Sequence, residues 1–410
     1  MKLILMFFAT LTFSSCRIIQ GLRIINAMQA ETMKQHSFKR ELPFQNVNGF
    51  IVVEMTVEGK IGHFILDTGA PTMLDENFAK SITFKTIGKQ KTIDSGGKIR
   101  NVKTIKLANV SVGGVDFQGI VAGISDLNVT KSALCTDFSG FLGANIMNKG
   151  VWQIDYANKK ITITDSRDSL QFSTDKKVVS FFSTGKGTPI IRMTANGVYL
   201  GEAEFDTGNS GNIIFTRQAA ANLPPLKGFI KSRGLISGAF GTRKDTILKI
   251  LLPTLTLSDS FEIRNTPVNL SRSLVGSPLI GYEFLKNYTV TIDWKYQEIT
   301  FSNYKPSVEN PYYVYGFSPR LMDGKLIVAS IAEQSAAFKA GLELNDQILQ
   351  INEMDFKNVT QNQYCDLMQK DLFTTTSTMV VTVRKGEKEV KYELTKTDLR
   401  GLLMKEENNK

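Results

Sequence analysis

The chain carries one sequence pattern twice, and this duplication constrains its fold more than any other feature. Residues 63–70 and 202–209 each consist of a short strand-like run that ends in an acid, a hydroxyl residue and a glycine. The two copies of that ending are Asp67-Thr68-Gly69 and Asp206-Thr207-Gly208. A glycine directly after a strand allows a sharp backbone turn, which pushes the preceding carboxylate out of the strand end.

The segments that follow the two copies also match each other. An apolar-apolar-glycine element ends at Gly143 in the first half and at Gly281 in the second, and a later strand ends at Asp155 and Asp293. Asp206 follows Asp67 by 139 residues, and the other two pairs are each 138 residues apart. The sequence therefore predicts a duplicated unit that stays in register over its whole length.

Over residues 41–304 the chain resembles the bilobal, pepsin-like aspartic peptidases, with lobes nearer in size to retropepsin-like proteins. The resemblance rests on the paired Asp-Thr-Gly motifs and on the apolar-apolar-glycine element behind each. It implies a mainly β, two-lobed acid-protease fold with pseudo-two-fold symmetry. It also implies that Asp67 and Asp206 are catalytic and that Thr68, Gly69, Thr207 and Gly208 support them, the threonines by hydrogen bonds across the lobe interface.

Two facing carboxyl groups have a defined chemistry. At a separation of about 3 Å they cannot both ionise, so the pair shares one proton over a wide pH range. One aspartate then acts as a base on a water molecule while the other donates a proton to the scissile carbonyl oxygen. We expect no metal and no cofactor. Ala70 and Asn209 replace the serine or threonine usual in pepsins, and we expect a mildly acidic to neutral optimum because Ala70 lacks a hydroxyl donor.

Each lobe has a hairpin with a glycine-rich tip that could close over a substrate. The two tips are residues 94–97, Asp-Ser-Gly-Gly, and residues 237–241, Ser-Gly-Ala-Phe-Gly. In the family such a hairpin is a flap, and glycine suits a moving lid. Both tips could equally be plain turns, because the aromatic residue common in pepsin flaps is missing from the lobe-one tip.

Charge and residue counts exclude several other functions. The net charge is +10, but Lys and Arg are scattered without a long basic run, so we expect no nucleic-acid binding. The chain has only two histidines, His36 and His63, which disfavours a zinc site or a Ser-His-Asp triad. We expect His63 to be an ordinary strand residue. Cys135 and Cys365 fall in different predicted domains, so we expect isolated thiols.

The N-terminal residues indicate export. Residues 1–15 combine Lys2 with an apolar run too short to span a bilayer, which is typical of a signal peptide. The run ends at Cys16 in a pattern that resembles a bacterial lipoprotein signal, and plain secretion is the alternative. Acylated Cys16 would anchor the protein in a membrane, facing the periplasm or the cell surface, with residues 16–40 as a tether that could include a short helix.

The C-terminal part resembles a PDZ domain of the bacterial protease type, over residues 306–403 and before a polar tail at 404–410. The resemblance rests on a short helix ending at Gly341 and on the strand-and-turn run 345–352 that follows it. PDZ domains add an extended peptide to a sheet edge beside a glycine-containing loop. By resemblance Tyr315, Gly316 and Phe317 form that loop, although such a domain can also pack on the protease and bind nothing.

These features give lobe one at residues 41–170 and lobe two at 171–305, with three possible functions. The first is a membrane-tethered aspartic endopeptidase, acting on protein or peptide substrates, whose PDZ domain recognises or regulates the substrate. The second is a peptide-binding scaffold with inactive lobes, for which Asn209 is the only hint. In the third, each lobe pairs with another chain. We expect a monomer because the duplication supplies both acids in one chain.

Overall fold

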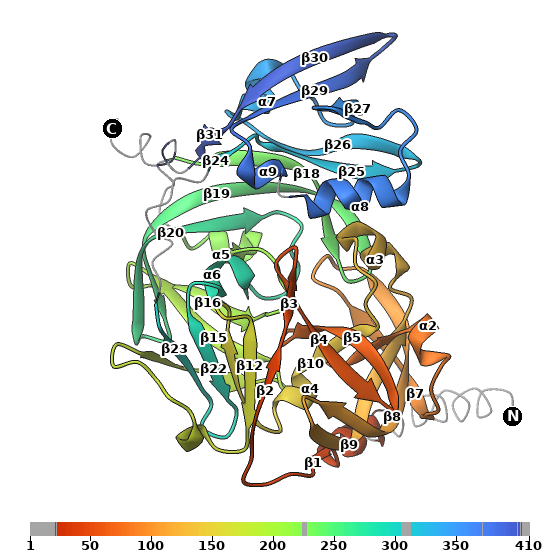
Figure 1. Ribbon diagram of the computed structural model, residues 1–410. Helices are drawn as coiled ribbons and strands as arrows, with labels where there is room; N and C mark the ends of the chain where they lie inside the picture. Colours follow the sequence, from red (N-terminus) through yellow and green to blue (C-terminus); the bar gives the residue numbers. More distant parts are fainter. Residues whose placement is uncertain are drawn as a thin grey trace, which may run out of the picture.

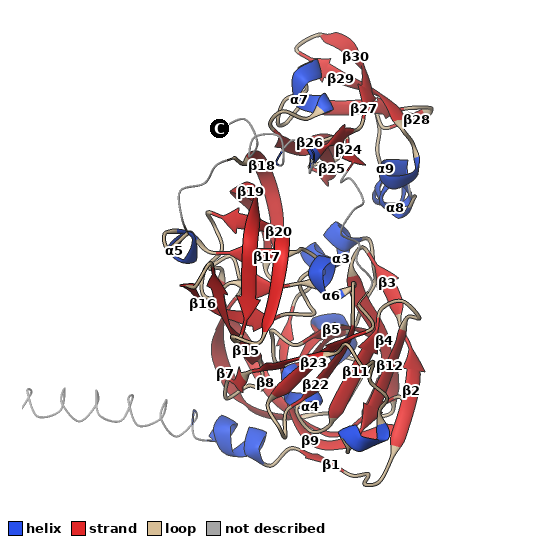
Figure 2. Ribbon diagram, turned by 90° about the vertical axis from the view of Figure 1, so that its left-hand side faces the viewer, coloured by secondary structure: helices blue, strands red, loops and turns tan. Residues whose placement is uncertain are grey.

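The structure is a computed structural model that describes residues 21, 23–223, 228–304, 313–370, 372–399, 401 and 403. The predicted signal peptide, Cys16 and the polar tail lie outside the described residues. The described chain is mainly β, as predicted, and consists of sheets of nine, six, fourteen and two strands. Figures 1 and 2 show two sheet-rich lobes with the strands and helices of residues 313–399 packed above them.

The first lobe is built on the nine-stranded sheet. Strands β4 and β5 form a hairpin, and the glycine element at 140–143 inserts beside β5 as a parallel strand. The strands are β1 (Thr32–Met33), β3 (Gln45–Val47), β4 (Phe50–Val57), β5 (Lys60–Asp67), β6 (Met73–Asp75), β7 (Lys85–Ile93), β8 (Ile99–Val112), β9 (Val115–Ser125) and β10 (Gly140–Gly143). The helices of this lobe are α2 (Glu76–Ala79), α3 (Asn128–Leu134) and α4 (Ala144–Met147).

The second lobe repeats this arrangement. Its hairpin β15–β16 turns at Asn196-Gly197, and β21 inserts parallel to β16 as β10 does beside β5. The strands are β14 (Phe182–Ser183), β15 (Pro189–Ala195), β16 (Val198–Phe205), β17 (Ile213–Phe215), β18 (Ile230–Gly238), β19 (Gly241–Leu257), β20 (Phe261–Ser271) and β21 (Leu279–Ile280), with helices α5 (Arg217–Ala220) and α6 (Tyr282–Leu285).

A six-stranded sheet joins the two lobes. Its central pair is β11 and β22, in which Gln153 lies opposite Thr291 and donates a hydrogen bond to its Oγ1 at 3.0 Å. These two residues are 138 positions apart in the sequence, which is the offset between the two copies. Equivalent strands of the two copies therefore pair with each other at the centre of this sheet. Its strands are β2 (Lys39–Pro43), β11 (Val151–Asp155), β12 (Lys160–Thr164), β13 (Lys177–Ser180), β22 (Thr289–Asp293) and β23 (Glu298–Ser302), with the 3₁₀ helix η1 (Arg167–Ser169) after β12. One hydrophobic core runs through both lobes and this sheet, which fixes their relative position.

The N-terminal segment packs on lobe one instead of extending as the expected tether. Residues 23–29 are helical, and Ile24 is buried with Ile87 and Val121. Glu31 is buried and accepts hydrogen bonds from the Val121 N–H (2.9 Å) and the Asn145 amide (2.8 Å). The chain joins the six-stranded sheet at Lys39. Any tether therefore ends before this segment.

The C-terminal domain follows the element order expected of it. A capping box of Thr360 and Gln363 begins α8. Gly341, with a φ of 97°, ends α7 in the left-handed region, where the sequence predicted the end of a short helix. The strands are β24 (Tyr313–Val314), β25 (Phe317–Met322), β26 (Lys325–Ala332), β27 (Gln347–Ile351), β28 (Met354–Asp355), β29 (Thr378–Lys385), β30 (Lys388–Thr395) and β31 (Thr397–Asp398), and the helices are α7 (Ala336–Ala340), α8 (Gln361–Gln369) and α9 (Leu372–Thr375).

This domain shares a sheet with lobe two. Strand β18 pairs with β26, with Arg233 opposite Ile331, so the fourteen-stranded sheet crosses from lobe two into the C-terminal domain. Glu333 forms ion pairs with Lys231 and Arg233, both at 3.1 Å. Figures 1 and 2 show the domain above β18 and α3.

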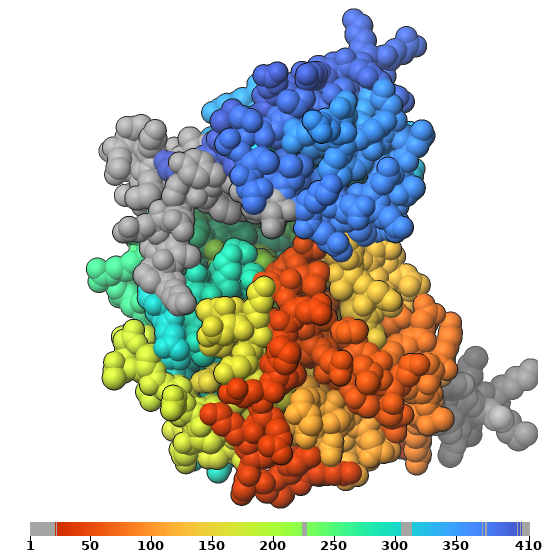
Figure 3. Space-filling model, viewed as in Figure 1, coloured from red at the N-terminus to blue at the C-terminus, as the bar shows by residue number. Residues whose placement is uncertain are grey.

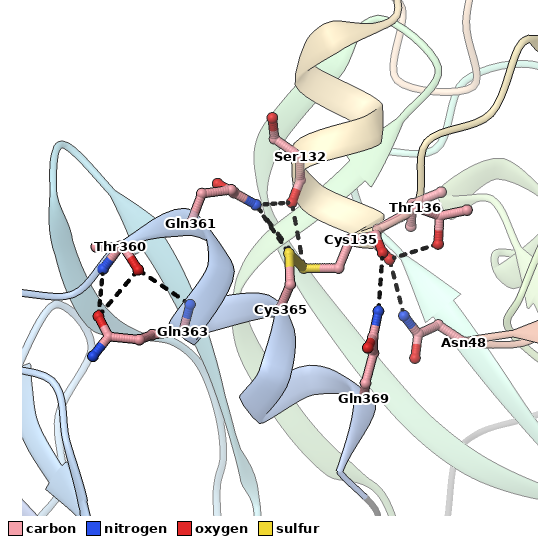
Figure 4. Close-up of a disulfide and its surroundings, with 10 residues drawn as sticks. Asn48, Ser132, Cys135, Thr136, Thr360, Gln361, Gln363, Cys365 and Gln369 are labelled. Atoms are coloured by element: carbon pink, nitrogen blue, oxygen red, sulfur yellow. Dashed lines mark hydrogen bonds between the residues drawn. A yellow bond between two sulfur atoms is a disulfide. The ribbon is translucent and has the colours of Figure 1, made fainter.

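A disulfide joins the same two parts of the molecule. Cys135, after α3, is bonded to Cys365 on α8, so the expectation of isolated thiols is wrong. Gln361 donates a hydrogen bond to the Ser132 carbonyl (3.0 Å) and Gln369 to the Cys135 carbonyl (3.4 Å), as Figure 4 shows. The sequence argument placed the two cysteines in different domains and therefore kept them apart. The domains pack against each other, and Figure 3 shows atoms of the C-terminal domain in close contact with atoms of the lobes.

Candidate active site

Each Asp-Thr-Gly motif lies at the end of a strand that is held by a parallel neighbour. Asp67 ends β5 opposite Gly143 of β10, and Asp206 follows β16, where its N–H donates to the Ile280 carbonyl at 3.0 Å. A Cβ on Gly143 would collide with the backbone of residues 71–72. Glycine is therefore required where the two chain segments cross behind the aspartate, which explains the apolar-apolar-glycine element.

The structure brings Asp67 and Asp206 together. Their carboxyl groups form a hydrogen bond with each other. Each also accepts a hydrogen bond at 2.9 Å from the N–H of the glycine in its own motif, Gly69 or Gly208. A Cβ on Gly69 would lie 2.8 Å from the Asp206 Cγ, and one on Gly208 would clash with the Asp67 Cγ. Both glycines are thus needed to let the carboxyl groups approach.

The two threonines cross between the lobes beneath the carboxyl groups. The Thr207 hydroxyl donates to the Leu66 carbonyl at 3.0 Å, and the Thr68 hydroxyl donates to the Phe205 carbonyl. Both side chains are buried. The expected cross-lobe hydrogen bonds are present, and they hold the two motif turns at a fixed separation.

The environment of the two carboxyl groups favours a shared proton. Burial raises the pKa of Asp67 to about 6, while the hydrogen bonds from the Gly69 N–H and from Asp206 act to lower that pKa. The pKa of Asp206 is raised well above its ordinary value, first by burial and then by the negative charges of Asp67 and Glu204. Because two buried carboxyl groups this close cannot both be ionised, the pair shares one proton.

An open cleft of about 1650 Å³ passes over the two aspartates. Ile25 of the N-terminal helical segment and Phe240 of the lobe-two hairpin are among the residues that line it. A cleft this large accommodates several residues of an extended peptide.

The two predicted flap tips meet each other at this cleft. One Asp94 carboxylate oxygen accepts hydrogen bonds at 2.9 Å from the Gly96 and Lys98 N–H groups, and the other accepts one at 3.1 Å from the Phe240 N–H. The Val275 N–H donates to the Ser95 carbonyl at 3.0 Å. Phe240 of the lobe-two tip supplies the aromatic side chain that the lobe-one tip lacks. The sequence did not show this, because it depends on the contact between the two tips in the folded protein.

The predicted loop of the C-terminal domain lines a second cavity of about 440 Å³. The Tyr315 side chain is buried, and its hydroxyl donates to the Thr376 carbonyl at 2.9 Å. Gly316 has a φ of 90°, and its carbonyl accepts from the Ala332 N–H at 2.7 Å, while Phe317 begins β25. Met368 of α8 forms another wall.

Lobe two also lines this second cavity, which the sequence argument missed. Ser232 of β18 and Lys249 of β19 both line it. Burial lowers the pKa of Lys249 to about 8. No sequence signal identified these residues, because they reach the C-terminal domain only through the pairing of β18 with β26.

The structure also places His63, which the sequence argument weighed as a possible triad residue. His63 is exposed on β5, as expected for an ordinary strand residue. Within the part of the chain that the structure describes, no group of three or more His, Cys, Asp or Glu side chains is placed to hold a metal ion.

None of the described helices combines the length and the apolar character needed to cross a membrane.

Comparison with protein families agrees with this geometry. The aspartyl protease family matches residues 53–146, and the PDZ domain family matches residues 309–371. The first match contains Asp67 but not Asp206, so the second acid rests on the internal repeat and on its position. No curated protein matches the chain at a significant level. The chain therefore combines an aspartyl protease domain with a C-terminal PDZ domain.

Proposed function

We propose that this protein is an aspartic endopeptidase in which Asp67 and Asp206 activate a water molecule between them. The observation that carries the proposal is the pair of hydrogen-bonded carboxyl groups, one from each half of a duplicated chain, on the floor of an open cleft. The raised pKa of each carboxyl group supports it, because such shifts are typical of catalytic acids and bases.

The charge of Glu204 disfavours ionisation of Asp206, so we take Asp67 as the base and Asp206 as the acid. Ionised Asp67 accepts a proton from the water, and protonated Asp206 donates its proton to the carbonyl oxygen of the scissile bond. The C–N bond of the tetrahedral intermediate then breaks as Asp67 passes its proton to the leaving nitrogen and a hydroxyl of the intermediate returns a proton to Asp206. Hydrogen bonds from Gly69 and Gly208 hold both carboxyl groups in place, so the geometry exists before substrate binds.

The PDZ domain would recognise a peptide and transmit its binding to the cleft. An extended peptide can add beside β25, next to the Gly316 loop. Arg320 of β25 donates a hydrogen bond to the Ser237 hydroxyl at 3.0 Å, at the tip of the lobe-two hairpin. Since β18 of that hairpin is also paired with β26, movement in the PDZ domain would reach the residues that cover the aspartates.

The proposed location is outside the cytoplasm, with Cys16 as a lipid anchor in a membrane. The disulfide between Cys135 and Cys365 supports export, because disulfides persist in oxidising compartments. Both acids come from one chain, which supports activity as a monomer.

The test is cleavage of an unfolded protein by the purified full-length chain, with and without pepstatin. Asp67→Asn and Asp206→Asn should each lower the rate by roughly 10³-fold, because each acid has its own proton-transfer role. Asp259→Asn removes an exposed carboxylate from the same lobe as Asp206 and should leave the rate unchanged. An inactive wild-type protein that still binds peptides would instead support the scaffold function.

A further inference from the structure

Glu204 places a third carboxyl group beside the two aspartates. It lies on β16, two residues before Asp206, and Phe205 between them is fully buried. Side chains alternate along a strand, so Glu204 and Asp206 face the same side, about 6.6 Å apart along the strand. Both residues line the cleft. Glu204 thus occupies the position that the next substrate side chain along the cleft would meet.

Lobe one has a different residue at the equivalent position. Ile65 lies two residues before Asp67 and is buried in an apolar cluster with Phe141 and Phe240. In lobe two, Glu204 is only half-buried, and its strand neighbour is Leu279, the counterpart of Phe141. The duplicated fold therefore gives one apolar and one acidic wall on the two sides of the aspartates. Core packing does not require an acid at this position, since an isoleucine fills it in the first copy.

The surroundings leave the Glu204 carboxylate without a direct partner. Burial raises the pKa of Glu204, the charge of Asp67 raises it further, and Lys186 opposes both effects. Lys186 also lines the cleft. Within the residues that the structure describes, the Glu204 side chain forms no hydrogen bond and no ion pair, so it is open to a ligand. Half-burying an acid without a partner costs free energy, and a cationic group that enters the cleft would relieve that cost.

We propose that Glu204 determines substrate specificity by binding a lysine or arginine side chain of the peptide next to the scissile bond. This inference rests on the proposed endopeptidase function. The Glu204 carboxylate accepts charge-assisted hydrogen bonds from the ammonium or guanidinium group, and the guanidinium can bind it in a bidentate way. The apolar wall formed by Phe141 and Phe240 favours an apolar residue on the other side of the bond.

The test compares peptides that differ at one residue beside the cleaved bond, which is Lys, Arg, Met or Glu. Glu204→Gln keeps the shape and removes the charge, and it should lower kcat/KM for the Lys and Arg peptides by roughly 10- to 100-fold, the range for a hydrogen bond to a charged group. The Met peptide should change less than about threefold. Glu204→Lys should invert the order and favour the Glu peptide. Glu202→Gln removes an exposed carboxylate from the same strand and should preserve the preference for basic residues.

Two outcomes would overturn the inference. Equal loss of kcat/KM on all four peptides would mean that Glu204 acts on the aspartates and not on the substrate. A wild-type preference for Met over Lys, whichever side of the cleaved bond carries the varied residue, would also refute it. Peptide binding to the Asp67→Asn variant, measured by fluorescence anisotropy, separates this inference from the proposed function. If the Asp67→Asn variant binds the Lys peptide more tightly than the Met peptide, and adding Glu204→Gln abolishes this difference, a subsite for basic residues is supported even without cleavage. Equal binding of the Lys peptide with and without Glu204→Gln refutes it.

Discussion

Thr68 and Thr207 each donate a backbone N–H to the hydroxyl oxygen of the other, at 3.1 and 3.0 Å. This reciprocal pair, together with the hydroxyl donation to the carbonyls of Leu66 and Phe205, pairs the N–H and hydroxyl groups of both threonines across the lobe interface. The separation of Asp67 and Asp206 is therefore set by buried hydrogen bonds and not by the loops above the cleft.

Thr207→Val should loosen this contact. Valine has nearly the same shape but leaves the Thr68 N–H and the Leu66 carbonyl unpaired in a buried place, which costs about 1–3 kcal/mol of the free energy of unfolding for each group. Urea titration measures the loss, and kcat should fall because the carboxyl groups are less well aligned.

Thr104→Val is the matched control for this variant. Thr104 is also fully buried, but its hydroxyl has no hydrogen-bond partner among the described residues. The substitution should be neutral or stabilising because it removes an unsatisfied polar group. Equal destabilisation by the two variants would contradict the role given to Thr207.

Asp206→Asn should remove activity and increase stability at neutral pH. The pKa of Asp206 is raised in the folded protein, whereas the unfolded carboxyl titrates near 3.8. The folded state therefore binds more protons than the unfolded state above about pH 4, so this residue lowers the stability as the pH rises. We expect a gain in the free energy of unfolding at pH 7 that shrinks as the pH falls and is largely lost at pH 4. The same gain at both pH values would contradict this.

The pH profile of cleavage should have its maximum in the mildly acidic to neutral range. The acid limb reports ionisation of Asp67, whose pKa is raised by burial to about 6. The alkaline limb reports loss of the proton from Asp206, whose pKa is raised well above its ordinary value. Initial rates measured from pH 2 to 10 on one peptide test this. A maximum near pH 2–3 would show that both carboxyl groups are far more acidic than their burial implies.

Loss of the disulfide should weaken the attachment of the PDZ domain. Cys135 and Cys365 are separated by 230 residues, so the bond restricts the unfolded chain strongly, and its loss should cost roughly 2–4 kcal/mol. Calorimetry of the double variant Cys135→Ser/Cys365→Ser should show a lower unfolding temperature. A reducing agent should lower that temperature in the wild-type protein but not in the double variant.

Gly234→Ala should disturb the strand that links the PDZ domain to the lobe-two hairpin. Gly234 has a φ of 154°, and an added Cβ would collide with the Ala329 carbonyl oxygen of β26. We expect faster hydrogen exchange of the β18 amides and a severalfold lower kcat/KM, because the hairpin over the aspartates loses its support.

Gly201→Ala controls for the effect of a side chain on a left-handed backbone. Gly201 has a φ of 117°, but an added Cβ would meet no atom within 4 Å. It should leave the exchange of β18 unchanged. If Gly234→Ala behaves in the same way, β18 and β26 are not coupled as proposed.

The sequence by itself determined the elements whose signals are local or repeated. The two Asp-Thr-Gly turns, the hairpins before them and the glycine elements behind them are specified by residues close in the chain, and the constant offset between copies predicted that Asp67 and Asp206 face each other. The end of α7 was predicted for the same reason, since Gly341 acts within one helical turn, and Thr360 caps α8 in an equally local way.

Only the tertiary structure decided the contacts between units. The bond between Cys135 and Cys365, the pairing of β18 with β26 and the meeting of Asp94 with Phe240 each join residues more than 90 positions apart. No local pattern encodes such contacts, because they depend on how whole domains pack. The packing also gave Glu204 its place, since a glutamate on a strand has no special meaning until the fold places it in the cleft beside two aspartates.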